Sequence, residues 1–195
     1  MEPSHEKQGT DVLDTVASNG VPVPEEAQTK PKDFRDVYKE FFLSVVDVKE
    51  KDFNQFIHPE KGLYIIESTG AMPQMVNIRD ISTFKRANDN KPFFDFDKTK
   101  VGIELIEKDI PSVDCDAPPE FYTKSGSFTQ EINKFKDSRI WEYAGLPKAE
   151  QKKIEELAET IVKTTVNTGN YTYYFSLINN KWHITFIDMR KPCVA

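Results

Sequence analysis

The feature that most constrains this chain is an Asn-Asn pair set between two runs rich in aromatic and β-branched side chains. Asn179-Asn180 separates residues 171–178 from residues 181–189. Asparagine tolerates the positive φ angles that both central residues of a two-residue type I′ turn require. The sequence therefore predicts a β-hairpin that turns at the two asparagines.

A two-residue turn also predicts the register of the strands that flank it. The pairs expected on one face are Leu177–Trp182, Phe175–Ile184, Tyr173–Phe186 and Tyr171–Asp188; those on the other are Ser176–His183, Tyr174–Thr185 and Thr172–Ile187. The first face is almost wholly apolar, so we expect it to pack on helices. The second mixes polar and aromatic groups, as does a face that lines a cleft or meets water.

Three helices are predicted. The first has Asp33 as N-cap and apolar residues at helical spacing from Phe34 to Val45. A short second one is capped by Asp47, paired with Glu50, and ends at His58-Pro59, where His58 is expected to cap the last carbonyls. A long third helix starts near Pro147 and ends at residues 167–170, where Gly169 suits a left-handed cap. Its inner face is expected to carry Ile154, Leu157, Ala158, Ile161 and Thr165, with Glu159 and Lys163 paired outside.

Further strands are predicted over residues 63–66, 101–106 and 118–122. Residues 68–75 are expected to form a loop, and residues 78–86 fit a short helix or a bent strand. Together these elements predict an α+β fold, a curved antiparallel sheet packed against two or three helices. We assign this single domain to residues 32–195.

Residues 1–31 contain no aromatic side chain and are rich in Pro, Glu, Ser and Gly. Such a composition cannot bury enough apolar surface to offset chain entropy, so we expect a disordered N-terminal arm. The arm carries most of the formal net charge of −6. The rest is nearly neutral with interspersed signs, which argues against nucleic-acid binding.

No apolar run is long enough for a transmembrane segment, and residues 1–31 contain no signal-peptide core. A chain that follows a cleaved signal would look the same. The two cysteines, Cys115 and Cys193, are either buried thiols or one disulfide. We favour the disulfide, because Cys193 follows Pro192 near the last residue, where a crosslink would hold the chain end.

A resemblance rests on Phe56-Ile57-His58-Pro59-Glu60-Lys61-Gly62-Leu63-Tyr64, on Ser68-Thr69-Gly70-Ala71-Met72-Pro73, and on residues 182–188 with Lys191-Pro192-Cys193-Val194-Ala195. These segments resemble uncharacterised secreted or lipid-anchored proteins of Bacteroidetes-type bacteria. The resemblance implies an NTF2-like, cystatin-like domain and an extracytoplasmic location, periplasmic or lipid-anchored. It implies no catalytic residue, and the chain shows no lipobox cysteine or signal sequence, so a cytoplasmic location stays the alternative.

Two residues are weak catalytic candidates. His183 is expected opposite Ser176, but the sequence has no GxSxG elbow, so a strand histidine beside a hydroxyl is the favoured interpretation. Asp188 is expected beside Tyr171 on the apolar face, where it must find a partner. We expect it to bind backbone amides, Arg190 or a lysine.

No metal or cofactor site is predicted. Asp95-Phe96-Asp97 and Asp114-Cys115-Asp116 alternate carboxylates but do not continue into a calcium-loop pattern. Asn170-Tyr171-Thr172 fits a glycosylation sequon, which we attribute to chance.

The favoured function is a non-catalytic exported module that binds a small molecule, a glycan or a protein partner. Tyr174, Ser176, His183 and Thr185 would form its binding face. The alternative is a small cofactor-free hydrolase or isomerase that uses His183 or Asp188. A third possibility is a homodimer formed through an exposed sheet face.

Overall fold

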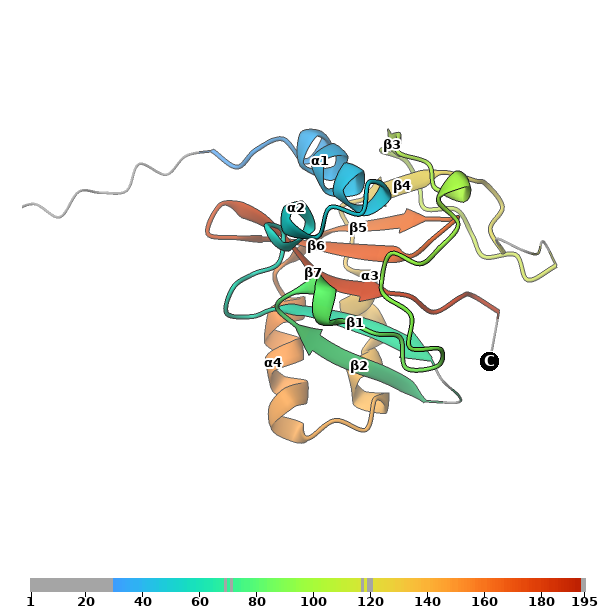
Figure 1. Cartoon of the computed structure of the whole chain (residues 1–195). Coiled ribbons are helices and arrows are strands. Elements are labelled where there is room, and N and C mark those ends of the chain that lie inside the picture. The colour runs from blue at the N-terminus through green and yellow to red at the C-terminus, as the bar shows by residue number, and fades with distance from the viewer. Residues whose placement is uncertain (1–29, 69, 71, 117, 119–120, 194–195) are drawn as a thin grey trace, which may run out of the picture.

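The computed structural model of the chain describes residues 30–68, 70, 72–116, 118 and 121–193. The arm expected over residues 1–31 thus lies almost wholly outside the described residues. At the centre is a 7-stranded sheet with the order β2-β1-β7-β6-β5-β4-β3 (Figure 1). Its strands are β1 (Leu63–Ser68), β2 (Pro73–Ile78), β3 (Leu105–Ile106), β4 (Ser127–Gln130), β5 (Ile161–Asn167), β6 (Thr172–Ile178) and β7 (Lys181–Asp188).

The sheet is mixed, which corrects the expectation of an antiparallel one. β1 runs parallel to β7, and β3 runs parallel to β4, while the other neighbours are antiparallel. A parallel pair needs a long connection between its strands, and the whole of β2 to β6 supplies it for β1 and β7. Short-range hairpin signals cannot predict such a pairing. The sheet is not closed, so β2 and β3 form its edges.

Helices cover both faces of the sheet (Figure 1). Four α-helices are described where two or three were expected, together with three short 3-10 turns. The α-helices are α1 (Phe34–Val46), α2 (Glu50–Asn54), α3 (Lys134–Ser138) and α4 (Lys148–Ala158), and the 3-10 turns are η1 (Ile81–Thr83), η2 (Lys98–Lys100) and η3 (Ile140–Tyr143). α1 and α2 pack on one face, and α3, η3 and α4 pack on the other.

The central strands bury consecutive side chains because both of their faces are covered. Tyr173 packs in the core under α1, whereas Tyr174 packs in the core under α3 and α4. In the same way, Ile65 and Ile66 of β1 are fully buried in opposite layers. The sequence of a strand that is buried on both sides is a continuous run of apolar residues.

The hairpin is confirmed. Asn179 and Asn180 have φ angles of 51° and 59°, as a type I′ turn requires. The expected pairs Leu177–Trp182, Ser176–His183 and Phe175–Ile184 are present. The four pairs expected beyond them are wrong because β7 carries a bulge at Thr185, which shifts the register by one residue. The observed partners are Tyr174–Phe186, Tyr173–Ile187 and Thr172–Asp188.

The long third helix was predicted to run too far. α4 ends at Ala158, and Ile161–Asn167 forms strand β5. This stretch is dominated by β-branched residues, which favour a strand and fit between β4 and β6. Gly169 consequently lies in the turn between β5 and β6. Glu159 and Lys163 do not pair with each other; they pair with Lys136 and Glu131.

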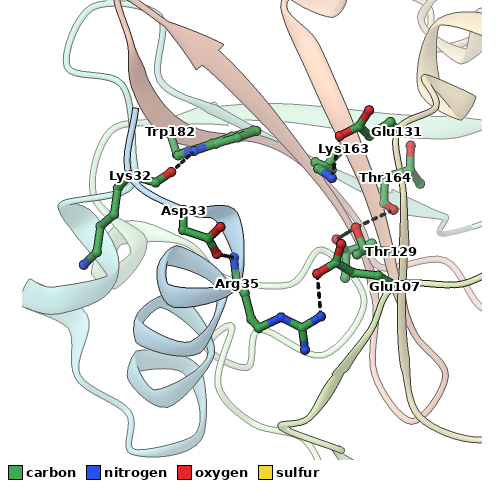
Figure 2. Close-up of polar contacts among 10 residues, drawn as sticks. Lys32, Asp33, Arg35, Glu107, Thr129, Glu131, Lys163, Thr164 and Trp182 are labelled. Atoms are coloured by element: carbon green, nitrogen blue, oxygen red, sulfur yellow. Dashed lines mark hydrogen bonds and ion pairs between the residues drawn. The ribbon is translucent and has the colours of Figure 1, made fainter. Parts of the chain in front are cut away.

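The start of α1 agrees with the sequence. The Asp33 side chain accepts a hydrogen bond from the backbone N–H of Arg35 (Figure 2). The Trp182 indole Nε1 donates to the carbonyl oxygen of Lys32 at 2.9 Å, and Arg35 pairs with Glu107 at 2.6 Å. These contacts hold the first turn of α1 against β7 and the segment after β3. For α2, the expected cap is wrong: Lys49 occupies the N-cap position, and Asp47 ends α1 instead.

The remaining strand predictions hold in part. β1 extends two residues past Ile66. The loop expected over residues 68–75 is wrong at its end, because β2 begins at Pro73, where a missing N–H is tolerated on an edge strand. Of residues 101–106, only Leu105–Ile106 pair as β3. Near residues 118–122, Tyr122 forms an isolated bridge with Val113. β4 and α3 were not predicted.

Candidate functional site

The face proposed to bind a ligand is closed. Tyr174 and His183 are only 6% and 4% exposed, and Ser176 and Thr185 are fully buried. The aromatic residues of α3 and η3 and the apolar side of α4 fill this face, packing on Tyr174. The expectation of an open polar face is therefore wrong, because the pattern of one hairpin does not show which helices pack on each of its faces.

His183 lies next to His58 instead of forming a dyad with Ser176. The two imidazole centroids are 4.8 Å apart. Ser176 shares a hydrogen bond of 2.7 Å with the hydroxyl of Thr185, so it is already engaged. Burial, reinforced by the charge of His58, lowers the pKa of His183 to about 4. At neutral pH the His183 ring is therefore uncharged.

His58 caps a turn, but its ring accepts hydrogen bonds, whereas a ring that capped helix carbonyls would donate them. Its Nδ1 accepts hydrogen bonds from the backbone N–H groups of Glu60 and Lys61, each at 3.2 Å. α2 ends at Asn54, and the carbonyls of Phe53 and Asn54 accept hydrogen bonds from the backbone N–H groups of Phe56 and Ile57. Burial lowers the pKa of His58 as well.

Asp188 has the structural role expected of it. Its carboxylate accepts hydrogen bonds from Nε and Nη2 of Arg190, at 2.9 and 2.7 Å, and from the Arg190 backbone N–H at 3.0 Å. The bulge moves Asp188 opposite Thr172, so it does not pair with Tyr171. His183 and Asp188 thus lie in two separate sets of contacts.

A cavity of about 280 Å³ lies where the turn between β5 and β6 meets the chain that leaves β7. Five stretches of the chain line it: Arg86, residues 95–97 with Lys100, residues 121–122, residues 168–172, and residues 190–192. These segments come from distant parts of the sequence, so no local motif marks the cavity.

Asn170 is the most unusual residue in this cavity. Its side-chain Nδ2 and Oδ1 are both buried, and neither has a hydrogen-bond partner. Nε of Arg86, which lines the same cavity, is also buried without a partner. A buried donor or acceptor with no partner costs roughly 1–3 kcal/mol. Three such atoms at one cavity therefore need an explanation.

The rest of the Arg86 guanidinium holds the wall together. Nη2 donates to the hydroxyl of Tyr171 at 2.9 Å and to the backbone carbonyl of Asp95. Burial raises the pKa of Tyr171 to about 12, so its hydroxyl stays protonated. Behind Arg86, the buried Glu67 accepts a hydrogen bond from the backbone N–H of Ala87, and burial raises its pKa.

The carboxylates at the cavity are already engaged. Asp95 pairs with Lys91 at 2.9 Å, which lowers the pKa of Asp95. Asp97 accepts hydrogen bonds from the hydroxyl and backbone N–H of Thr99, which lower its pKa. Asp188, next to the cavity, is likewise bound to Arg190.

Four aromatic residues contribute to the cavity wall: Phe96, Phe121, Tyr122 and Tyr171. All are half-buried. Phe121 has a φ angle of 60°, which is rare for a bulky side chain. Such strain persists where the surrounding structure enforces it, often at binding sites.

The cysteines form the expected disulfide. Cys115 and Cys193 are bonded, with their Cα atoms 5.5 Å apart, and both residues are exposed. Cys193 directly follows the cavity segment 190–192. Cys115 lies in the loop closed by the Val113–Tyr122 bridge. The disulfide therefore connects two walls of the cavity.

The alternating carboxylates have local partners. Asp114 accepts a hydrogen bond from the backbone N–H of Asp116 at 3.0 Å, as in an Asx turn. Across the described part of the chain, no three His, Cys, Asp or Glu side chains gather as metal ligands would.

No protein-family model, curated protein or solved structure matches this chain. Within the described residues, no helix combines the length and the apolar character needed to cross a bilayer.

Proposed function

We propose that this chain is a non-catalytic binding module that holds a small polar ligand in the cavity between the β5–β6 turn and residues 190–192. The observation that carries the proposal is the Asn170 amide. Its donor and its acceptor are both buried at the cavity without partners. Neither atom is exposed in this structure, so a ligand would recover the free energy that the unliganded protein forgoes by drawing the Asn170 side chain into the cavity.

The proposal includes export. A disulfide persists in oxidising compartments, so the Cys115–Cys193 pair supports an extracytoplasmic location. The α+β architecture, with a sheet packed on helices, is compatible with an NTF2-like domain, which we retain as part of the proposal. A homodimer would need a surface other than an open sheet face, because helices cover both sides of the central strands.

The alternative, a cofactor-free hydrolase or isomerase, lacks comparable support. A general base must reach its substrate and have a pKa near the working pH. His183 is 4% exposed and has a pKa of about 4. Asp188 is held by Arg190. Neither group is placed to work with the other.

The test compares two substitutions of the same kind. Asn170→Leu removes unpartnered polar atoms, so we expect the free energy of unfolding to stay the same or to rise. Asn133→Leu is the matched control, because the Asn133 amide donates to the Ala158 carbonyl at 2.7 Å and accepts from Lys136 N–H at 2.9 Å. We expect this control to lose roughly 1–3 kcal/mol, measured by urea denaturation.

The same variants are then screened by NMR against a chemically diverse fragment library. We expect wild-type protein to show saturable shifts at the amides of residues 168–172, and Asn170→Leu to show none. The proposal fails if Asn170→Leu is destabilised as much as Asn133→Leu and no fragment shifts those amides.

A further inference from the structure

We infer that β2 is a docking surface for a second copy of this chain. Two copies pair their β2 strands antiparallel about a two-fold axis, which joins the two sheets into one continuous sheet. The inference goes beyond the proposed function and uses no part of the cavity, so the two stand or fall separately. It follows from the composition of β2, from the direction of its free backbone groups and from the exposed side chain at its centre.

β2 lacks the features with which proteins block an open sheet edge. Such edges are usually short, charged, bulged or covered, because their unpaired N–H and C=O groups can pair with another strand. β3, at the other border of the sheet, has only two residues and is followed by Glu107 and Lys108. β2 has six residues, carries no charged side chain and pairs with β1 without a register shift. Its one proline, Pro73, is its first residue.

The outer side of β2 is open. β2 is the last strand of the sheet on the β1 side (Figure 1). Within the part of the chain that the structure describes, no segment other than β1 makes a backbone hydrogen bond to β2. The helices cover the faces of the sheet and leave this edge unpaired.

The Ile66 carbonyl shows which way the backbone of β1 points. It accepts a hydrogen bond of 2.9 Å from the N–H of Met189, the residue that follows β7. Successive residues of a strand direct their backbone groups to opposite sides. The backbone groups of Ile66 therefore face β7, and those of the neighbouring Ile65 face β2. The partner of Ile65 on β2 is Val76, so the backbone groups of Val76 face β1.

The same alternation along β2 leaves two complete residues directed outward. Because Val76 bonds to β1, the N–H and C=O groups of Met75 and Asn77 face away from the sheet. If Val76 lies opposite its own copy, Met75 of each chain lies opposite Asn77 of the other. Each such pair exchanges two hydrogen bonds, so the two pairs supply about four. A register centred on Met75 would instead set Asn77 against Pro73, which has no N–H to donate.

The side chains of β2 fit this pairing. Val76 is 43% exposed, although it is apolar and lies in a strand. Opposite its own copy it occupies a non-hydrogen-bonded pair, where Cα atoms lie about 4.5 Å apart, so the two valines shield each other from water. Gln74 lies opposite Ile78. Arg79, the first charged residue after β2, comes opposite Pro73, and no like charges meet.

The first experiment measures the molar mass of the full chain in solution. Sedimentation velocity without reductant, from about 10 µM to about 1 mM protein, covers the affinities expected of a weak dimer. We expect the average mass to rise with concentration from that of one chain toward that of two. Circular dichroism and thermal melts show whether each variant below is folded.

Two lysine variants locate the interface. Val76→Lys sets two like charges opposite each other, so we expect the dissociation constant of the dimer to rise about tenfold or more. Val162→Lys is the matched control, because Val162 is also an exposed strand valine, 36% exposed, but lies in β5 between β4 and β6. We expect it to dimerise as the wild type does.

Two cysteine variants test the register. Cys115 and Cys193 are bonded to each other, so an added cysteine is a free thiol. We expect Val76→Cys to form a disulfide-linked dimer under mild oxidation, seen on a non-reducing gel. Gln74→Cys is the control, because in this register the two copies of residue 74 lie roughly 14 Å apart, too far for a disulfide.

Three results would overturn the inference. The first is a wild type that stays monomeric up to the highest concentration. The second is a dimer that Val76→Lys leaves unchanged, since the interface would then lie elsewhere. The third is cross-linking of Gln74→Cys but not of Val76→Cys, which is incompatible with the antiparallel register. Fragment binding at the cavity bears on none of these results, so the proposed function is judged by its own experiment.

Discussion

Arg86 Nη2 donates a hydrogen bond of 2.9 Å to the Tyr171 hydroxyl, although the two residues are separated by 85 positions in the chain. The same nitrogen bonds the carbonyl oxygen of Asp95. One guanidinium thus joins the segment after η1, the loop before η2 and the turn between β5 and β6. These three segments form much of the cavity wall, so its shape depends on this side chain.

Replacing Arg86 by lysine should loosen the wall. Lysine keeps the charge but lacks the planar fork, so it cannot reproduce both hydrogen bonds. The side chain is only 17% exposed, and we expect Arg86→Lys to lower the free energy of unfolding by roughly 1–3 kcal/mol. Arg79→Lys is the control, since Arg79 makes an exposed contact with the Glu60 carbonyl. Equal urea midpoints for both variants would contradict the prediction.

Gly169 should not tolerate a side chain. A Cβ atom at this position would lie 2.0 Å from the backbone carbonyl oxygen of Lys100, so the turn between β5 and β6 would have to move. We expect Gly169→Ala to cost roughly 1–3 kcal/mol and to alter the cavity. At Gly70 a Cβ would meet no atom within 4 Å, so Gly70→Ala is the matched control. Thermal melts of the two variants that coincide would count against this close approach.

Breaking the disulfide should affect both stability and binding. Cys115 and Cys193 are 78 residues apart, and for such a loop the chain-entropy account gives roughly 4–5 kcal/mol of stabilisation. We expect dithiothreitol to lower the urea midpoint of the wild type and to weaken ligand binding, because two cavity walls separate. The double variant Cys115→Ser/Cys193→Ser should start from the lower midpoint and not respond to reductant. A wild-type midpoint that reductant leaves unchanged would refute the crosslink.

Acid should destabilise the protein partly through His183. Its pKa is about 4 in the folded chain but about 6.5 when unfolded, so the unfolded state binds more protons between these values. The stabilisation is complete above about pH 6.5 and is lost as the pH falls toward 4. Lys181 and His58 face the ring and oppose its protonation.

The measurement compares wild type with His183→Phe. Between pH 7.5 and pH 5, we expect the wild type to lose roughly 2 kcal/mol more than the variant. Paired carboxylates lose stability in acid in both proteins, so only the difference between the two is informative. Parallel pH curves would show that His183 does not titrate as described.

Local signals in the sequence predicted the parts of the fold that depend on neighbouring residues. The Asn179-Asn180 turn and the Asp33 cap are examples, because backbone conformation and a side chain two residues away determine them. The disulfide was favoured from the position of Cys193. The bulge at Thr185 left no such signal, and it moved Asp188 to a new partner.

The predicted third helix was too long because its helical periodicity outweighed a strand signal that was also present in the sequence. Ile161 and Thr165 continue the helical spacing of Ile154 and Ala158, so periodicity alone extends the helix. The β-branched run that begins at Ile161 favours a strand, and the neighbouring strands β4 and β6 decide the outcome. Because β5 was not foreseen, neither was its turn at residues 168–171.

The candidate site could not be predicted because tertiary packing assembles it. In the sequence, Asn170 drew notice as part of a sequon and of the predicted end of the third helix. Asn170 matters because its side-chain amide is buried without a hydrogen-bond partner. That burial depends on tertiary packing, which brings Arg86 and residues 121–122 to the same cavity. The polar face of the hairpin, by contrast, looked open because the pattern of one hairpin says nothing about which helices cover it.

The parallel pairing of β1 with β7 has a consequence for the order of synthesis. Tyr64 aligns with Phe186, so the middle of the sheet cannot close until residues 181–188 have left the ribosome. Until then β1 and β6 lack the strand that lies between them, and their apolar side chains stay accessible to chaperones or to other nascent chains. Synthesis of β7, more than any local folding step, therefore determines when the native sheet can form.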